Sequence, residues 1–494
     1  MTTRNRHSVK LFYSYAHEDE RWRKELAKHL GRVNISGWYD REIKAGTSWE
    51  NEIDENLEEA DIVLLLVSPD FKASDYCYGK EMKVALKRQK EEKAHVIPIF
   101  IRPVHWPDAP YLHLQIPNSG QPVTISTNRD LAFMNIAKEV HRVIDSVLKK
   151  QYIQDAENFI ENSQDEEAYR AYKQAIYHAP EDVVLREKVG DLLFSLERYE
   201  EALEAYKKAI ELQAENDRFY RKKGQALTYL GRHEEALTAY LQAAKLREND
   251  FALYKMIGDT FYILKRLDEA QGAYKEAMSL RSDDYRQYMS LGNAFFKLNN
   301  YHDALDAYER AAHLKDDDAQ IYMSKGKTLL ALENYDGALA AYERVIVLNP
   351  DDPSPYVDKG YVFDELGEYE KALQAYEEAL ALDRENAQLW RDKGDILVKM
   401  QRPEEAHDAY EQAISLAPEN AFFYKDSADT LFNLQRYEEA LAVYDEAIAR
   451  NPTIKNWYAS RYKAKKKLAE KMEKMHKDLM KSADEDKINA EKRE

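Results

Sequence analysis

The chain has 494 residues, enough for about three domains, and its single cysteine, Cys77, excludes an intramolecular disulfide framework and a multi-cysteine zinc site. A formal charge of −18 disfavours general binding to nucleic acid or anionic membranes. The longest apolar run is 62–67 and the first ten residues are polar and basic, so we expect a cytoplasmic protein without a membrane span or a secretion signal.

The first 148 residues alternate between patterns typical of strands and of helices. Strands are predicted at 9–15, 37–39, 62–67 and 95–101, with a short fifth strand at 123–125. Helices are predicted at 20–30, 48–59, 76–92 and 131–148. Because strands joined through helices pair in parallel, residues 1–148 are expected to form an α/β domain with a flavodoxin-like parallel sheet flanked by helices.

Four segments, in this order, resemble the motifs of the TIR (Toll/interleukin-1 receptor) domain. They are Phe12-Tyr13-Ser14-Tyr15 with Asp19, Trp38-Tyr39-Asp40-Arg41 leading into Lys44-Ala45-Gly46 and Trp49, Ser68-Pro69-Asp70-Phe71, and Ser74-Asp75-Tyr76-Cys77 ahead of Glu81. The resemblance spans residues 8–148. It is strongest to TIR modules that are fused to other domains in bacterial defence and signalling proteins.

This resemblance implies an activity and a site. Many TIR domains are NAD⁺ glycohydrolases that use a glutamate near the start of the helix after the third strand, and the matching residue is Glu81. Nicotinamide leaves as a neutral molecule, so one carboxylate that stabilises positive charge on the ribose can suffice, and the product is ADP-ribose or a cyclised form. The resemblance places NAD⁺ beside Ser14, Trp38, Asp40, Arg41, Lys44, Gly46, Tyr76 and Cys77.

The chain departs from the family at one position of this motif. TIR hydrolases usually carry a tryptophan four residues before the glutamate, where this chain has Cys77 flanked by Tyr76 and Tyr78. We expect an aromatic surface to be kept through a one-residue shift. A purely structural interpretation stays open, because a glutamate in the first turns of a helix also favours the helix dipole. No metal or cofactor is indicated, and NAD⁺ would be the substrate.

A strict internal repeat follows. Glycines recur every 34 residues from Gly190 to Gly394, an alanine follows each by 12 residues and a tyrosine by 16, and the phase extends back to divide 149–454 into nine units. Two apolar blocks in each unit predict two antiparallel helices. The pattern resembles the tetratricopeptide repeat (TPR), including closing prolines at Pro180, Pro350, Pro418 and Pro452, and implies an all-α solenoid.

The first helix of each unit is expected to line a concave, partner-binding groove. Candidate contacts for a protein or peptide ligand are Lys255, Met289, Phe296, Met323 and Tyr361. Self-association through the same groove is an open alternative. The lysine–asparagine clamp by which some chaperone-binding repeats grip a terminal carboxylate is not matched, because Lys255 is followed one turn later by Asp259.

Residues 455–494 are rich in lysine. Trp457, Tyr458, Leu468, Met472, Met475 and Leu479 have near-helical spacing, which predicts a capping helix, and the tail from Ser482 is expected to be frayed. A basic, lipid-binding helix is the alternative.

Together these features favour a TIR-domain NAD⁺ glycohydrolase in immune-type or antiphage signalling, regulated by partner binding to the repeats or by self-assembly, with TIR–TIR self-association through the loop around Lys44. The alternative is a non-catalytic adaptor in which the TIR domain recruits other TIR domains.

Overall fold

The computed structural model describes residues 8–31, 35–39 and 49–491. The chain divides into two compact units, Met1–Arg247 and Glu248–Glu494.

The first unit begins with a parallel sheet, which confirms the predicted α/β class. Its strands are β1 (Val9–Tyr15), β2 (Ile35–Trp38), β3 (Ile62–Val67) and β4 (His95–Phe100), in the order β2-β1-β3-β4. Every residue of β3 is buried, as the continuous apolar run requires for a central strand covered on both faces.

The predicted strand at Val123–Ile125 is wrong. These residues form a 3₁₀ turn whose Thr124 N–H donates to the Ile101 carbonyl at 3.0 Å, just beyond the end of β4. The preceding Pro122 has no N–H, so a longer ladder of sheet hydrogen bonds could not begin there.

Helices cover both faces of this sheet. On one face α2 (Trp49–Glu59) and α4 (Met82–Lys90) share a core cluster with Phe12 of β1 and alternate residues of β3. On the other face α1 (Glu20–Leu30) and α5 (Arg129–Glu161) pack together. A short helix that the sequence pattern missed, α3 (Pro69–Ala73), begins after Ser68, whose Oγ accepts the Phe71 N–H at 3.1 Å.

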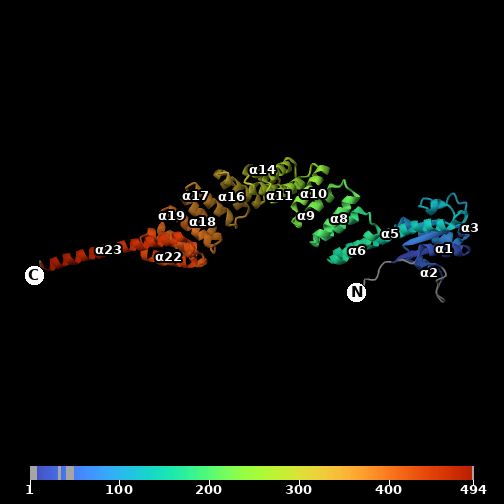
Figure 1. Cartoon of the computed structure of the whole chain (residues 1–494), viewed down its shortest axis with the longest axis horizontal. Coiled ribbons are helices and arrows are strands. Elements are labelled where there is room, and N and C mark those ends of the chain that lie inside the picture. Colours follow the sequence, from blue (N-terminus) through green and yellow to red (C-terminus); the bar gives the residue numbers. More distant parts are fainter. Residues whose placement is uncertain (1–7, 32–34, 40–48, 492–494) are drawn as a thin grey trace. The chain divides into compact units, whose positions relative to one another are not determined.

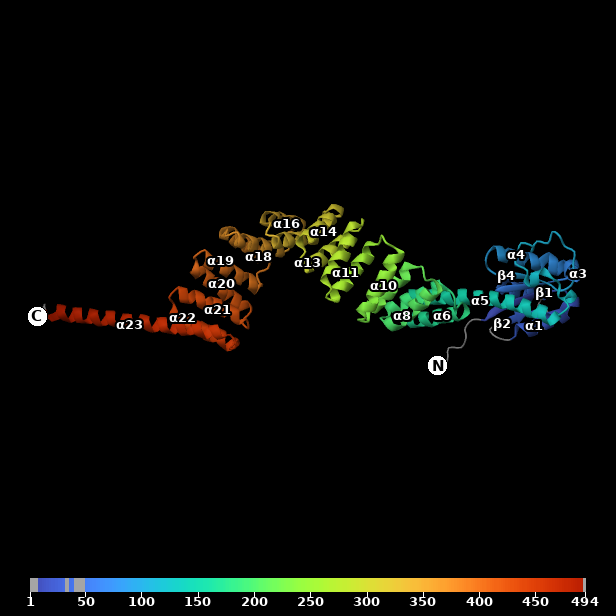
Figure 2. The same ribbon diagram turned by 45° about the horizontal axis from the view of Figure 1, so that its top comes forward.

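The helix predicted to end at Leu148 continues to Glu161 as part of the 33-residue α5. Its first part covers the sheet, and its last part packs with α6 (Asp165–His178) as the first helix of the first repeat (Figures 1 and 2). No glycine or proline lies between 129 and 161, so nothing in the sequence interrupts the helix. The α/β domain and the first repeat therefore share one helix.

Antiparallel helix pairs make up the rest of the repeat region, which confirms the predicted all-α solenoid. With α5–α6 as the first, the described residues contain nine pairs. In the first unit they continue as α7 (Val183–Ser195), α8 (Tyr199–Leu212), α9 (Asp217–Tyr229) and α10 (His233–Leu246). In the second unit they are α11 (Phe251–Ile263), α12 (Leu267–Ser279), α13 (Tyr285–Lys297), α14 (Tyr301–Leu314), α15 (Ala319–Ala331), α16 (Tyr335–Leu348), α17 (Ser354–Glu365), α18 (Tyr369–Leu382), α19 (Ala387–Lys399), α20 (Pro403–Leu416), α21 (Ala421–Asn433) and α22 (Tyr437–Arg450).

The periodic glycine and tyrosine meet inside each repeat. The ring of Tyr308 lies against Gly292 so closely that a Cβ added there would stand 2.6 Å from Cε1. The hydroxyl of Tyr308 then donates to Asn293 Oδ1 at 2.7 Å. The glycine is thus needed for space, because a side chain at this position of the first helix would displace the ring that joins the two helices.

The last helix, α23 (Lys455–Glu491), caps the repeats. Trp457 and Ala464 are buried against the last repeat. The helix continues past Ser482, where we expected regular structure to end, and it runs out beyond α22 (Figures 1 and 2). Residues 455–486 contain no glycine or proline, and ion pairs one turn apart, such as Lys477–Glu473 at 2.6 Å, support the helix without tertiary packing.

Replacing Gly292 by alanine tests this packing. We expect Gly292→Ala to lower the free energy of opening of α13 and α14 by about 1–3 kcal/mol, because the added methyl overlaps Tyr308. The measurement is hydrogen exchange of peptides from these helices in the full chain. Gly272→Ala on α12 is the matched control: its Cβ would meet nothing within 4 Å, so it should raise helix stability by about 0.5–1 kcal/mol. Equal protection in the two variants would contradict the steric role.

Candidate functional site

A cavity of about 420 Å³ opens at the carboxyl ends of β1 and β3. Ligands generally bind at this edge of open parallel sheets. Its wall is built from β1 and the residues that follow it, helix α3, the turn that leads into α4, and one residue of α2. The lining residues are Phe12, Tyr13, Tyr15, Ala16, His17, Glu18, Ile53, Asp70, Ala73, Ser74, Tyr76, Cys77 and Glu81.

Glu81 lies inside this cavity, not at the outer surface. Its side chain is only 5% exposed. Ser14, near the end of β1 and fully buried, donates its Oγ–H to Glu81 Oε2 at 2.5 Å. A carboxylate buried this deeply needs hydrogen-bond donors, and the Ser14 hydroxyl supplies a strong one and fixes the orientation of the group. The candidate catalytic residue Glu81 and the candidate substrate-binding residue Ser14 are therefore in direct contact.

The turn that carries Glu81 is a π-helix, Cys77–Glu81, in which the Met82 N–H donates to the Cys77 carbonyl. A π-turn holds one more residue than an α-turn. The five-residue spacing between Tyr76 and Glu81 therefore brings both side chains to the cavity, as a four-residue spacing would in an α-helix. Tyr76, one residue before the position of the family's tryptophan, thus lines the cavity together with Glu81. Tyr78 packs instead on Trp106, with ring centroids 5.0 Å apart.

Two more side chains that line the cavity are Cys77 and Tyr13. Cys77 is buried and its Sγ donates to the Tyr15 carbonyl at 3.4 Å. Burial raises the pKa of Tyr13 to about 12, although nearby Arg23 opposes the shift, so this phenol stays protonated at neutral pH.

The remaining predicted residues separate into two groups. Trp38 stacks on Phe12 with ring centroids 5.3 Å apart and packs against the core, so the cavity wall described above does not include it. Asp40, Arg41, Lys44 and Gly46 lie outside the described residues.

Asp19, Ser68 and Asp70 belong to the sequence motifs, but the sequence did not predict that they meet Arg102 in a charged cluster next to this cavity. Asp19 is fully buried, accepts from Ser68 Oγ at 2.5 Å and accepts from Arg102 Nε at 2.8 Å. Arg102 also pairs with Asp70 on the cavity wall. These residues follow β1, β3 and β4, so one arginine ties the ends of three strands together. The sequence did contain one indication of this cluster. Each of these residues comes just after a predicted strand, and the carboxyl ends of parallel strands meet at one edge of the sheet.

A family model described as TIR domain matches residues 11–132. Models described as tetratricopeptide repeat match residues 221–285, 289–353 and 391–453, and residues 327–389, and one described as TPR repeat matches 190–228. The chain is a TIR domain followed by TPR repeats.

The chain is 41% identical over 144 residues to the uncharacterized protein y4lF of Sinorhizobium fredii (strain NBRC 101917 / NGR234), a match that covers 28% of this chain and 45% of that protein. It therefore spans less than half the length of this curated relative. YrrB, a TPR protein with an unusual peptide-binding site, is 23% identical with a TM-score of 0.34, over 38% of this chain and 96% of YrrB. The C-terminal part of a TPR repeat-containing protein from Cytophaga hutchinsonii is 19% identical with a TM-score of 0.40, over 48% and 97%.

The predicted contacts in the TPR repeats have different surroundings. Tyr361 is 47% exposed, and Met289 is partly exposed. Phe296 is half-buried against Tyr301, and Lys255 pairs within its own helix with Asp259 at 2.7 Å.

Met323 needs a correction. It is buried in a core cluster with Leu329 and Val362, so in this structure it is not available to a ligand. Met323 is the fifth residue of α15 and packs with Val362 of the next repeat. An apolar side chain at this position is therefore buried between repeats.

The described residues contain one group of side chains with the spacing of metal ligands. Glu25, His29 and Asp130 bring possible metal-ligand atoms within 4.8 Å of one another, but Glu25 is already paired with Lys28 and His29 stacks on Phe133. No helix in the described part of the chain is long and apolar enough to cross a membrane.

The charged cluster gives a test of how the TIR domain is held together. Arg102→Leu leaves the Asp19 carboxylate buried without its cationic partner, and we expect a loss of about 3–5 kcal/mol in the stability of the sheet. Hydrogen exchange of β3 measures this loss. Lys10→Leu is the control, because it breaks an ion pair with Glu59 that is exposed on both sides and is worth less than about 1 kcal/mol. Similar losses in the two variants would show that Arg102 has no special structural role.

Proposed function

We propose that the TIR domain cleaves the bond between nicotinamide and ribose in NAD⁺, with Glu81 as the catalytic residue. The observation that carries this proposal is the buried Glu81 carboxylate, hydrogen-bonded to Ser14 and lining a cavity at the carboxyl edge of a parallel sheet. The match to the TIR family supports it, because TIR domains can be NAD⁺ glycohydrolases.

The chemistry requires one well-placed negative charge. As the C–N bond breaks, its electron pair goes to the pyridinium ring, nicotinamide leaves as a neutral molecule, and positive charge moves onto the ribose. A carboxylate fixed beside the ribose stabilises this oxocarbenium-like state more than it stabilises the bound substrate, and it therefore lowers the energy barrier of the reaction. Water then adds to the ribose and loses a proton, giving ADP-ribose; attack by the adenine ring instead gives a cyclised product.

The other residues of the cavity suit a cationic, aromatic group. Glu18, Asp70 and Glu81 line it, and Tyr76 offers an aromatic ring beside Glu81. Asp70 is already paired with Arg102, which leaves Glu81 as the carboxylate with the most enclosed position. An aromatic ring can stack on nicotinamide while the carboxylate contacts the ribose.

The TPR repeats supply the regulation in this proposal. A protein or peptide bound to them, or self-assembly, would bring TIR domains together and switch on hydrolysis in an immune-type or antiphage response in the cytoplasm. The shared helix α5 supports this arrangement, because it joins the first repeat directly to the sheet of the domain that contains Glu81.

The first test is Glu81→Gln, which keeps the shape of the side chain and removes its charge. We expect release of nicotinamide from NAD⁺ to fall by about 10²–10³-fold, the usual cost of losing one preorganised electrostatic contact. The measurement is chromatography of nicotinamide from purified full chain, with and without a crowding agent that promotes assembly. Glu91→Gln, an exposed position just after α4, is the matched control and should keep full activity.

Undiminished release from Glu81→Gln, or no release from the native chain under either condition, would contradict the enzymatic proposal. A chain that still signals normally with glutamine at this position would be a non-catalytic TIR adaptor.

The second test concerns Tyr76. We expect Tyr76→Ala to lower kcat/KM for NAD⁺ by about two- to twelvefold, because one aromatic contact is worth about 0.5–1.5 kcal/mol, while Tyr76→Phe keeps the ring and should stay near the native value. Steady-state kinetics of nicotinamide release give both numbers. If the phenylalanine variant loses as much as the alanine variant, the hydroxyl and not the ring is the important group.

A further inference from the structure

The π-turn Cys77–Glu81 brings two side chains to the cavity that an α-helix could not place there together. Tyr76 and Glu81 are five residues apart in the chain, and both line the cavity. In an α-helix, residues five apart point in directions about 140° apart, because each residue turns the chain by about 100°. A π-turn closes a larger ring, so residues five apart come to lie on the same side. If the segment relaxed to an α-helix, one of the two side chains would leave the cavity.

Two hydrogen bonds fasten this π-turn to strand β1. The π-helix is a rare form, so a single turn of it depends on contacts outside the helix. At the start of the turn, Cys77 Sγ–H donates to the Tyr15 carbonyl at 3.4 Å. At its end, Glu81 Oε2 accepts from Ser14 Oγ–H at 2.5 Å. Both ends of the turn are therefore held by consecutive residues of one strand.

Burial makes these two hydrogen bonds the important contacts of the turn. Ser14 is fully buried, and Cys77 and Glu81 are 8% and 5% exposed. The loss of a buried hydrogen bond costs more than the loss of an exposed one, because water does not replace the missing partner. The turn also has an ion pair to α2, between Lys80 and Asp54 at 2.8 Å, but these side chains are 40% and 44% exposed. Exposed pairs of this kind contribute little.

Position 77 is where this chain departs from the motif of TIR hydrolases, which usually have a tryptophan there. In this structure the thiol of Cys77 faces the strand, and the aromatic ring beside Glu81 comes from Tyr76. Cys77 belongs to the core cluster that also contains Phe12 and Ala16. A small side chain with a hydrogen-bond donor therefore fits between the turn and the strand.

We propose that Ser14 and Cys77 are positioning residues. They hold the π-turn on β1, and the turn keeps Glu81 and Tyr76 together in the cavity, so neither positioning residue has to contact NAD⁺. This inference rests on the function proposed above for Glu81. It gives both residues a task other than the substrate contact that the resemblance to TIR domains implies.

Steady-state kinetics of nicotinamide release from NAD⁺ by the full chain test the proposal. We expect Ser14→Ala to lower kcat by about 10–100-fold and to leave KM within about twofold, because a displaced catalytic group slows the chemical step and not binding. Cys77→Ala should lower kcat by about two- to tenfold, the effect of one neutral hydrogen bond. Cys77→Ser keeps a donor and should stay near the native value. The double alanine variant should lose less than the product of the two single losses, because both bonds hold the same turn.

Cys77→Trp separates the two possible roles of position 77. The variant restores the residue of the family, so it should raise activity if this position contacts the substrate. We expect it to lower kcat at least as much as Cys77→Ala does. Cys77 is packed among core residues, and a large ring there would displace the turn or fill the cavity.

Hydrogen exchange of the full chain gives a readout that does not need activity. Peptides covering 74–84 should exchange faster in Ser14→Ala and in Cys77→Ala than in the native chain, because the turn opens more often.

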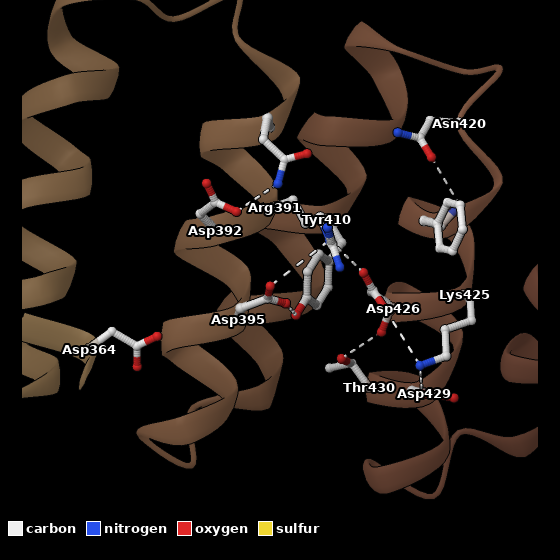
Figure 3. Close-up of polar contacts among 12 residues, drawn as sticks. Asp364, Arg391, Asp392, Asp395, Tyr410, Asn420, Lys425, Asp426, Asp429 and Thr430 are labelled. Carbon is white, nitrogen blue, oxygen red and sulfur yellow. Dashed lines mark hydrogen bonds and ion pairs between the residues drawn. The ribbon is translucent and has the colours of Figure 1, made fainter. Parts of the chain in front are cut away.

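Two control variants leave the turn intact. Tyr410→Phe removes a hydrogen bond of the same kind in the eighth repeat, where the Tyr410 hydroxyl donates to Asp395 Oδ1 at 2.6 Å (Figure 3). Ile136→Val lowers the stability of the TIR domain from α5, on the other face of the sheet. Neither should change kcat or the exchange of 74–84.

The outcomes distinguish this proposal from the function on which it rests. Full kcat in Ser14→Ala, in a native chain that releases nicotinamide, would overturn the positioning role and leave the catalytic proposal standing. A rise in KM alone would make Ser14 a substrate contact, and higher activity in Cys77→Trp would do the same for position 77. Unchanged exchange of 74–84 in both alanine variants would show that the two hydrogen bonds do not hold the turn. A native chain that releases no nicotinamide would remove the proposed function and both positioning roles with it.

Discussion

The burial of one carboxylate is the constraint on which the TIR domain's site depends. Glu81 is held away from water, and Ser14 of β1 donates a hydrogen bond to it; an unpaired charge in this position would cost several kcal/mol. The π-helix before α4 sets where that carboxylate lies, and the Asp19–Arg102 pair fixes the strand ends around it. The position of Glu81 is therefore set by residues at the carboxyl edge of the sheet.

In the TPR repeats, the residues that pack the two helices together are fixed, and the residues next to them vary. Glycine and tyrosine at fixed positions hold the two helices of a repeat together, and the tyrosine hydroxyl often donates to the residue after the glycine, as Tyr274 does to Asp259 and Tyr410 to Asp395. Where that acceptor is replaced by Lys327, the hydroxyl of Tyr342 is left buried without a partner among the described residues. The contact between glycine and tyrosine is therefore kept even where the residue after the glycine changes from an acceptor to a lysine.

Much of this could be predicted from the sequence. The 34-residue period gives the helix pairs, because each repeat places the same residues in the same contacts, and the motifs around Ser14 and Glu81 point to two residues that touch. The failures have physical causes. The end of α5 was missed because a helix without glycine or proline continues for as long as packing supports it. Arg102 was missed because its partners come from distant strands, and Met323 because a groove position can also face the core.

The continuity of α5 has a mechanical consequence. The helix that covers one side of the sheet through Phe133, Ile136 and Val140 is the same helix that contacts α6, and no flexible joint separates the two ends. A tilt imposed on the first repeat is transmitted along this rod as a torque on the sheet itself. The first repeat and the sheet therefore move together unless α5 itself bends.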